Sequence, residues 1–280
     1  MRRSHSICIK ATPENGLRFM PKLDNLMIGC GSMGEALLQN WLRSGHEFSI
    51  IDPVLDEPIS GATLVNEVSE LSGHMFDAII IAIKPQLIDK VMPTFAPMLA
   101  PNGFVLSIAA GCSIARIKSV LGDAPVIRVM PNIPAAIGKG VSALCASPDA
   151  SQEHLSYARS IMELTGTAIT VEDEDQIDRF TAIAGSGPGY IFEFARAYAN
   201  AATDMGFDAA SSRAMVLDMI DGAIAMARAS SEDLAELRNS VTSKGGTTAA
   251  GLDALNAAGD LSALLKATVE AAYDRARELK

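Results

Sequence analysis

The chain has 280 residues, of which 49% are hydrophobic and 5% are aromatic, and its formal net charge is −10. This length and hydrophobic content fit one large or two ordinary globular domains. The acidic balance argues against a surface for nucleic acid or anionic lipid, so we expect a small ligand and neither a nucleic-acid nor a membrane partner.

The cysteines and histidines indicate neither a disulfide framework nor a metal site. Four cysteines occur without a CxxC pair, and the four histidines show no spacing that would complement them. We therefore expect no metal and a reducing cytoplasm. Residues 1–22 are basic but lack a signal-peptide apolar core, and no later segment has about eighteen uninterrupted apolar residues. A flexible N-terminal extension is predicted there, with a transit peptide as the less favoured interpretation.

The first motif follows a short apolar run at residues 26–28. Gly29–Gly34 has the spacing G-x-G-x-x-G, and apolar residues then recur at helical spacing. A strand before and a helix after these glycines are the context that dinucleotide binding requires. Gly29 would make the tight turn, Gly31 would admit the pyrophosphate, and Gly34 would allow close packing of helix and strand. A second strand at residues 48–51 ends on Asp52, where a ribose-binding acid is expected.

Further apolar runs at residues 78–83, 104–108 and 126–130 predict strands that are covered on both faces of a parallel sheet. Lys84 and Ala109 follow two of these runs, at the strand ends where ligands bind. Residues 64–67 are a weaker strand and turn, which would place Asn66 near the adenine side. Two added strands are expected at residues 141–145 and 166–171.

The character of the sequence changes after Val171. An acidic run at residues 172–175 is typical of a solvated helix start, and helical periodicity without a convincing strand follows. Residues 184–190 interrupt the helix, and helices rich in alanine and methionine are expected from about 190 to 205 and from 209 to 228. Such small apolar helices need more burial than one chain offers, so we expect a helical dimer interface. We predict a dinucleotide-binding domain at 23–171 and a helical domain at 172–280.

A second candidate site lies near the end of the chain, in the run from Ser243 to Thr248. Gly245 and Gly246 let the backbone approach a ligand closely, and Thr247 and Thr248 can cap the helix that follows. Free N–H groups beside hydroxyls would suit a small carboxylate. An ordinary glycine-rich turn is the alternative for this stretch taken by itself.

Taken together, the chain resembles the pyrroline-5-carboxylate reductase family from about Leu26 onward. The motifs that carry the resemblance are residues 28–34, Ile83–Gln86, Met130–Pro134, Gly185–Pro188 with Tyr190, and Gly245–Thr248. The resemblance implies an α/β Rossmann-like N-terminal domain with an all-α C-terminal dimerisation domain, in a homodimer or a larger homo-oligomer. It also implies NAD(P)H-dependent hydride transfer to the C=N bond of 1-pyrroline-5-carboxylate, giving L-proline in the last step of proline biosynthesis.

The resemblance also assigns site residues. It implies a catalytic role for Thr248 and substrate contacts for Glu174, Thr247 and Thr248, beside the glycines Gly245 and Gly246. The residues expected around the cofactor are Gly29, Cys30, Gly31, Ser32, Met33, Gly34, Asp52, Asn66, Ile83, Lys84 and Ala109. Two positions depart from the family pattern: Lys244 stands where proline is usual, and Gly189 where alanine is usual.

Two other interpretations stay open at the level of sequence. A 3-hydroxyacid dehydrogenase would share the first half of the chain, although its Lys-x-x-Asn helix motif is not found. A catalytically idle dinucleotide-binding relative would not need Thr247 and Thr248. For the cofactor, Asp52 favours NADH over NADPH because a carboxylate accepts hydrogen bonds from ribose hydroxyls and repels a 2′-phosphate.

Overall fold

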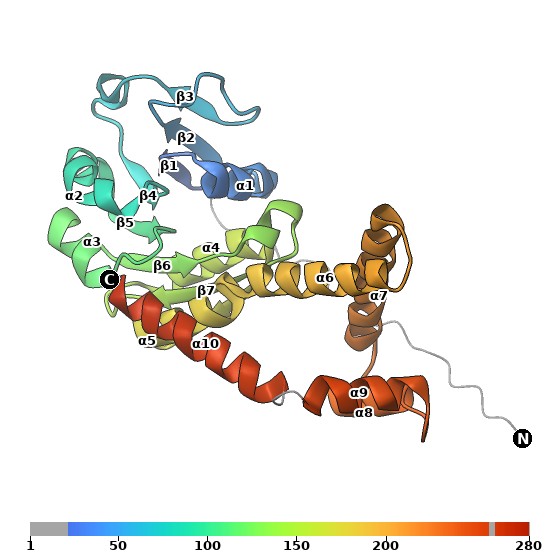
Figure 1. Cartoon of the computed structure of the whole chain (residues 1–280). Coiled ribbons are helices and arrows are strands. Elements are labelled where there is room, and N and C mark those ends of the chain that lie inside the picture. The colour runs from blue at the N-terminus through green and yellow to red at the C-terminus, as the bar shows by residue number, and fades with distance from the viewer. Residues whose placement is uncertain (1–21, 258–260, 280) are drawn as a thin grey trace, which may run out of the picture. The chain divides into compact units, whose positions relative to one another are not determined.

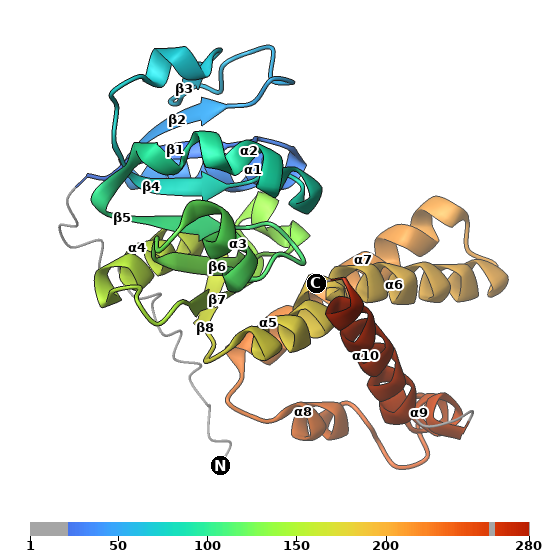
Figure 2. The same ribbon diagram turned by 90° about the vertical axis from the view of Figure 1, so that its left-hand side faces the viewer.

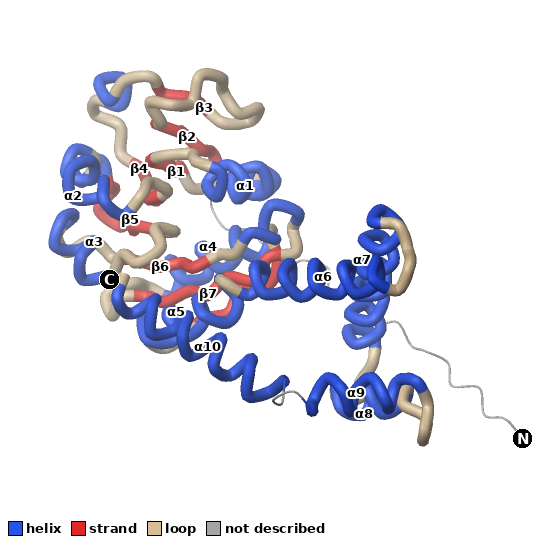
Figure 3. Tube along the Cα trace, viewed as in Figure 1, coloured by secondary structure: helices blue, strands red, loops and turns tan. Residues whose placement is uncertain are grey.

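The computed structural model describes residues 22–257 and 261–279, so the predicted extension at residues 1–22 lies almost entirely outside the described residues. By their contacts the described residues form two compact units. The sheet unit comprises residues 22–188 and 269–279, and the helical unit comprises residues 189–257 and 261–268. Strands lie only in the sheet unit among the described residues (Figure 3).

The sheet unit is built on one mixed sheet. Its strands are β1 (Asp24–Ile28), β2 (Glu47–Ile51), β3 (Thr63–Val65), β4 (Phe76–Ile81), β5 (Leu99–Ser107), β6 (Val126–Met130), β7 (Gly140–Ala146) and β8 (Gly166–Thr170). They lie in the order β3-β2-β1-β4-β5-β6-β7-β8 (Figure 2). All neighbours pair in parallel except β6 and β7, which are antiparallel. The strand order reverses at β1, between β2 and β4, which is where such sheets bind ligands.

Helices cover both faces of this sheet. They are α1 (Ser32–Trp41), α2 (Ile88–Val91), α3 (Ile114–Leu121), α4 (Gln152–Glu163) and α5 (Glu174–Phe180). Short 3-10 helices lie at Leu42–Ser44, Val68–Leu71, Pro85–Leu87, Met92–Thr94, Ala96–Met98 and Ile133–Ile137. Figure 1 shows these elements in chain order from blue to red.

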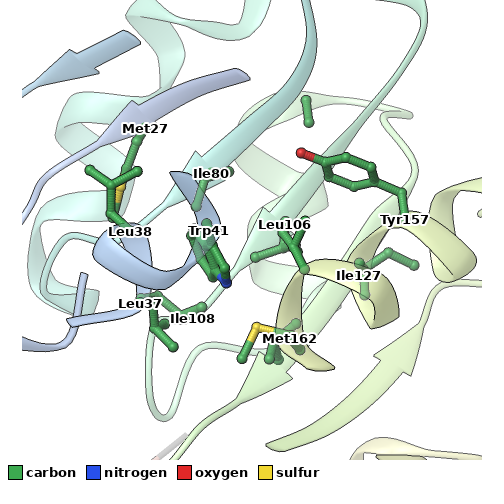
Figure 4. Packing of buried hydrophobic residues seen from close by; sticks show 14 of the residues in the cluster. Met27, Leu37, Leu38, Trp41, Ile80, Leu106, Ile108, Ile127, Tyr157 and Met162 are labelled. Atoms are coloured by element: carbon green, nitrogen blue, oxygen red, sulfur yellow. The ribbon is translucent and has the colours of Figure 1, made fainter. Parts of the chain in front are cut away.

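Successive side chains of a strand point to opposite faces of the sheet, which explains why the sheet has a buried apolar cluster on each face. In β1, Met27 points into a cluster with α1 and α4, whereas Leu26 and Ile28 point into a second cluster with α2 and α3. Both sets are buried, and for that reason the strands read as continuous apolar runs. Figure 4 shows Trp41 of α1 packed within the first cluster.

The helical unit follows an irregular junction. A single π-helical turn at Thr181–Gly185 ends α5, with the Ser186 amide donating to the Thr181 carbonyl at 2.8 Å. The helices that follow are α6 (Gly187–Asp204), α7 (Ala209–Ala229), α8 (Leu234–Ser240), α9 (Thr247–Ala257) and α10 (Leu261–Glu278). The predicted interruption at residues 184–190 overlaps only the end of this π turn, because residues 187–190 already belong to α6.

The helical unit has almost no interior of its own. Among its described residues only Ala195, Ser212 and Val216 are buried. Large apolar side chains of its helices are exposed instead, including Phe192 at 63%, Ile224 at 52% and Met226 at 64%. No helix among the described residues is long and apolar enough to cross a membrane.

The predicted fold class, a Rossmann-like domain followed by an all-α domain, is confirmed. The domain boundary predicted at residue 172 does not coincide with the boundary between the two compact units. By their contacts, α5 and the end of α10 belong to the sheet unit.

A buried hydrogen bond between α4 and β1 gives a test of the sheet unit. The Tyr157 hydroxyl donates to Asn25 Oδ1 at 2.5 Å, and Asn25 Nδ2 donates to the carbonyls of Leu23 and Glu47. Tyr157→Phe should lower the free energy of unfolding by about 1–3 kcal/mol, because Asn25 Oδ1 would remain buried without its donor. Urea unfolding at fixed protein concentration measures this loss.

The control is Thr167→Val, which removes a hydroxyl from an exposed side chain of β8 in the same unit. This change should shift stability by less than about 0.5 kcal/mol. Equal losses for the two variants would show that the Asn25 contact contributes nothing special.

Candidate functional site

The glycine turn after β1 is the structural centre of the first site. Gly29 has φ +82°, and a Cβ there would lie 2.6 Å from Ile83 Cγ2 and 2.9 Å from the carbonyl oxygen of Ala82. A Cβ on Gly34 would lie 2.7 Å from Met27 Cε. A larger residue at position 29 would clash with the Ala82 backbone after β4 and strain the positive φ, whereas at position 34 the end of the Met27 side chain would have to move.

The start of α1 faces open space. Gly31 precedes the helix as its N-cap and supplies no side-chain cap, and a Cβ built on Gly31 meets no atom within 4 Å. The first amides of a helix lack intrahelical acceptors and carry the positive end of the helix dipole. This arrangement fits a phosphate group held by backbone N–H groups.

A pocket of about 210 Å³ lies over this helix start. It is lined by the start of α1 and by the residues that follow β4 and β5, namely Gly31, Ser32, Met33, Gly34, Ala82, Ile83, Lys84, Ile108, Ala109 and Ala110. The carboxyl ends of neighbouring parallel strands therefore meet at the point where the strand order reverses, as in dinucleotide sites.

Most of the predicted cofactor residues meet at this pocket. Those that line it are Gly31, Ser32, Met33, Gly34, Ile83, Lys84 and Ala109, whereas Gly29, Cys30, Asp52 and Asn66 are outside its lining. Ala82, Ile108 and Ala110 also line it and were absent from the prediction. Their only sequence signal is their position beside predicted residues at the ends of β4 and β5.

Asp52 connects β2 to the glycine turn. The Cys30 amide donates to Asp52 Oδ2 at 2.6 Å, and the Val54 amide donates to Asp52 Oδ1 at 2.9 Å. Both carboxylate oxygens therefore accept backbone hydrogen bonds. These bonds hold Asp52 in one orientation beside the turn.

Cys30 is a buried thiol in the same turn. Burial, followed by the nearby carboxylates of Glu35 and Asp52, raises the pKa of Cys30 to about 11. A thiol with this pKa stays protonated at neutral pH and is a poor nucleophile. Cys30 can therefore pack against a ligand but is unsuited to covalent catalysis.

Asn66 directly follows β3 and is exposed. Its backbone amide donates to Glu70 Oε1 at 3.1 Å. Because β3 is parallel to β2 and β1, Asn66 lies at the same edge of the sheet as the glycine turn.

Glu174 begins α5 and belongs to a polar cluster behind the pocket. Its Oε1 accepts hydrogen bonds from Arg128 Nη1 at 2.6 Å and from the Ile114 amide at 3.0 Å. Arg128 is only 3% exposed, and Asp178 Oδ1 lies 3.9 Å from Arg128 Nη2. The carboxylate of Glu174 thus balances a buried charge and holds the first turn of α3.

The second predicted site is a turn in the helical unit. The Gly246 amide donates to the Ser243 carbonyl at 3.0 Å, and Gly245 has φ +69°. A Cβ on Gly246 would lie 2.3 Å from Ser243 Oγ. The positive φ favours glycine at position 245, and a side chain at position 246 would displace the Ser243 hydroxyl. The turn leads directly into α9.

Thr247 and Thr248 are the first two residues of α9, and both are exposed. Lys244 is exposed within the turn. The structure thus brings Gly245, Gly246, Thr247 and Thr248 together on one helix start. Glu174 belongs to the sheet unit, whereas these four residues belong to the helical unit.

Sequence models of two families match the chain. One is described as pyrroline-5-carboxylate reductase dimerisation and matches residues 174–279. The other is described as NADP oxidoreductase, coenzyme F420-dependent, and matches residues 26–111. The second match covers the strands and turns that form the pocket.

Curated relatives and solved structures extend over nearly the whole chain. The pyrroline-5-carboxylate reductase of Pseudomonas aeruginosa is 34% identical over 90% of this chain and 95% of its own length. That of Vibrio alginolyticus is 36% identical over 90% of this chain and 96% of its own length. A solved pyrroline-5-carboxylate reductase from Coxiella burnetii superposes with a TM-score of 0.86 at 28% identity, covering 93% of this chain and 99% of that one. A Plasmodium falciparum pyrroline carboxylate reductase structure with NADP bound gives a TM-score of 0.80 at 25% identity, covering 93% and 99%. The resemblance seen in the motifs is confirmed, and the chain belongs to the pyrroline-5-carboxylate reductase family.

Proposed function

We propose that the chain reduces the C=N bond of 1-pyrroline-5-carboxylate to give L-proline, using a reduced nicotinamide dinucleotide. The observation that carries this proposal is the pocket over the start of α1, in a chain of this family. Its open Gly31 and uncapped first turn fit a pyrophosphate. When bound, the dinucleotide supplies the hydride, and the protein supplies position and polarity.

The cofactor assignment divides the predicted residues by role. The amides around Gly31 and Ser32 hold phosphate, and Gly29 and Gly34 maintain the turn. Met33, Ile83, Lys84 and Ala109 give the pocket its wall, while Cys30, Asp52 and Asn66 lie along the edge leading toward β3 and hold the adenosine side. Every one of these residues belongs to the sheet unit.

The substrate assignment rests on the start of α9. Gly245 and Gly246 expose the backbone, so the amides of the first turn bind the substrate carboxylate together with Thr247. The Thr248 hydroxyl contacts the ring nitrogen and keeps the imine in line for hydride transfer. Glu174 is the least supported substrate ligand, because its Oε1 is already shared by Arg128 and Ile114.

The two predicted domains follow from these roles. Residues 23–171 bind the dinucleotide, and residues 172–280 bind the substrate and form the dimer. A homodimer, alone or within a larger homo-oligomer, buries the exposed apolar faces of α6 and α7.

The activity is tested with the purified full chain. Proline-dependent reduction of NAD or NADP, and oxidation of NADH or NADPH by pyrroline-5-carboxylate, should both occur. A chain that binds dinucleotide but shows neither reaction would support the catalytically idle alternative instead.

Thr248→Ala tests the catalytic assignment. Loss of a hydrogen bond to a charged group should cost about 1.5–3 kcal/mol of transition-state binding, seen as a lower kcat/KM for pyrroline-5-carboxylate. Thr248→Ser keeps the hydroxyl and should retain most of the activity. Wild-type kcat/KM in the alanine variant would remove Thr248 from the mechanism.

The dimer is tested by sedimentation at micromolar concentration, where we expect a dimer or a multiple of it. Ile224→Glu places a charge on the exposed face of α7. In this variant the dimer should dissociate and the helical unit should unfold in the same step. Met75→Glu, at a side chain that is 46% exposed in the sheet unit, is the control and should stay associated. A folded, active monomeric wild type would contradict the proposal.

Cofactor preference is tested at Asp52, which we propose favours NADH. Both of its oxygens are fixed by backbone amides, so the charge cannot move away from a 2′-phosphate. We expect a preference of about 1–2 kcal/mol in kcat/KM for NADH over NADPH. Asp52→Ser and Asp52→Asn should both reduce this preference. Asp52→Asn keeps the shape and one of the two hydrogen bonds from the backbone amides, whereas Asp52→Ser also shortens the side chain. A loss of preference of similar size in both variants would therefore follow from the loss of charge.

Equal or better use of NADPH by the wild type, with no change in either variant, would mean that Asp52 only holds the glycine turn.

A further inference from the structure

The loop between β5 and α3 carries part of the pocket. Ile108, Ala109 and Ala110 line it, and Gly111 follows with φ +71°. Ile108, Ala109 and Cys112 are buried, and the Ile108 amide donates to the Ile81 carbonyl at 3.0 Å, so the base of the loop is held by the sheet. Ala110 is exposed and Gly111 is half-buried, so the position of this part of the wall depends on what packs against it.

The end of α10 lies directly against this loop. A Cβ built on Gly111 would lie 2.9 Å from the backbone oxygen of Leu279. Residues 269–279 belong by contact to the sheet unit, although α10 begins in the helical unit. A segment more than a hundred residues away in sequence thus packs on a wall of the pocket.

A polar contact anchors the end of α10. The Tyr273 hydroxyl donates to Asp175 Oδ1 in the first turn of α5, and the Arg277 guanidinium lies 5.6 Å from the centre of the Tyr273 ring. Asp175 also pairs with Arg179 at 2.7 Å. Figure 1 shows the red end of α10 beside α5.

The first turn of α5 also holds the far side of the loop. Glu174, the neighbour of Asp175, accepts from the Ile114 amide at the start of α3. The buried Arg128 fixes the Glu174 carboxylate from the other side. The loop is therefore bounded by Leu279 at Gly111 and by Glu174 at Ile114.

We propose that the end of α10 and the first turn of α5 form a brace that positions the β5–α3 loop for cofactor binding. Tyr273 and Glu174 are its positioning residues. This inference rests on the proposed function, because it assigns the braced pocket to the dinucleotide. The brace acts on cofactor affinity, since misplacing a wall of a binding site weakens the ligand that contacts it.

Two variants of the full-length enzyme remove the brace by different routes. A chain ending at Glu278 lacks the residue opposite Gly111, and Tyr273→Phe lacks the hydroxyl that anchors α10. Both should raise the dissociation constant of the reduced dinucleotide, measured by calorimetry, by about three- to tenfold, as expected for one partly exposed polar contact. Tyr198→Phe is the control and should bind like the wild type.

Steady-state kinetics separates positioning from general damage. KM for the dinucleotide should rise in step with the dissociation constant, while kcat and KM for pyrroline-5-carboxylate should stay within about twofold. If kcat fell in both variants while the dissociation constant of the dinucleotide stayed unchanged, the proposed role of the brace in cofactor binding would be contradicted.

A double-mutant cycle tests the contact itself. Gly111→Ala places a methyl group against the Leu279 oxygen and also strains a positive φ, so it should weaken dinucleotide binding in the full chain. In the chain ending at Glu278 the clash is gone and only the strain remains, so the same substitution should cost several-fold less. Additive effects would show that Leu279 and Gly111 are not coupled.

Dinucleotide binding by the wild type and by the variants separates a failure of the brace from a failure of the proposed function. A wild-type chain that binds neither NADH nor NADPH refutes both. Tight wild-type binding that is unchanged in Tyr273→Phe and in the shortened chain refutes the brace alone.

Discussion

The close approach of the β1–α1 turn to β4 is the constraint on which the cofactor site depends. Only a glycine fits where Gly29 faces Ile83 and the Ala82 backbone, and Gly34 lets the end of the Met27 side chain lie close to α1. These contacts bring the open start of α1 and the end of β4 to one place. The pocket is therefore a consequence of backbone packing, and its walls need few large side chains.

The helical unit depends on burial from outside itself. With three buried side chains among its described residues, it lacks the apolar interior that offsets the conformational entropy of ordering its helices. Its family model is a dimerisation model, which fits this deficit. The glycine turn before α9 sits in this unit, so in the proposed enzyme the substrate site forms only when the chains associate.

Local patterns predicted much of the fold. The apolar run before Gly29, the glycine spacing and the amphipathic run after it are all short-range signals, and the strands were visible because both faces of the sheet are covered. The antiparallel direction of β7 had no such signal. Nor did the Glu174–Arg128 contact, between residues 46 apart, or the Tyr273–Asp175 contact, between residues 98 apart. Such pairings are set by tertiary packing, and residue type alone does not reveal which charges meet.

Asp52 shows that the position of a residue after a strand can be predicted while its hydrogen bonds are missed. Its position at the end of β2 follows from spacing, but its hydrogen bonds to the Cys30 and Val54 amides do not. Each carboxylate oxygen has two lone pairs, so accepting an amide still leaves capacity for a ribose hydroxyl. The amides instead remove the freedom of the side chain to rotate away. In the proposed enzyme, the turn that binds the pyrophosphate thus also holds the carboxylate that discriminates against a 2′-phosphate. Recognition of the pyrophosphate and recognition of the ribose therefore depend on the same turn.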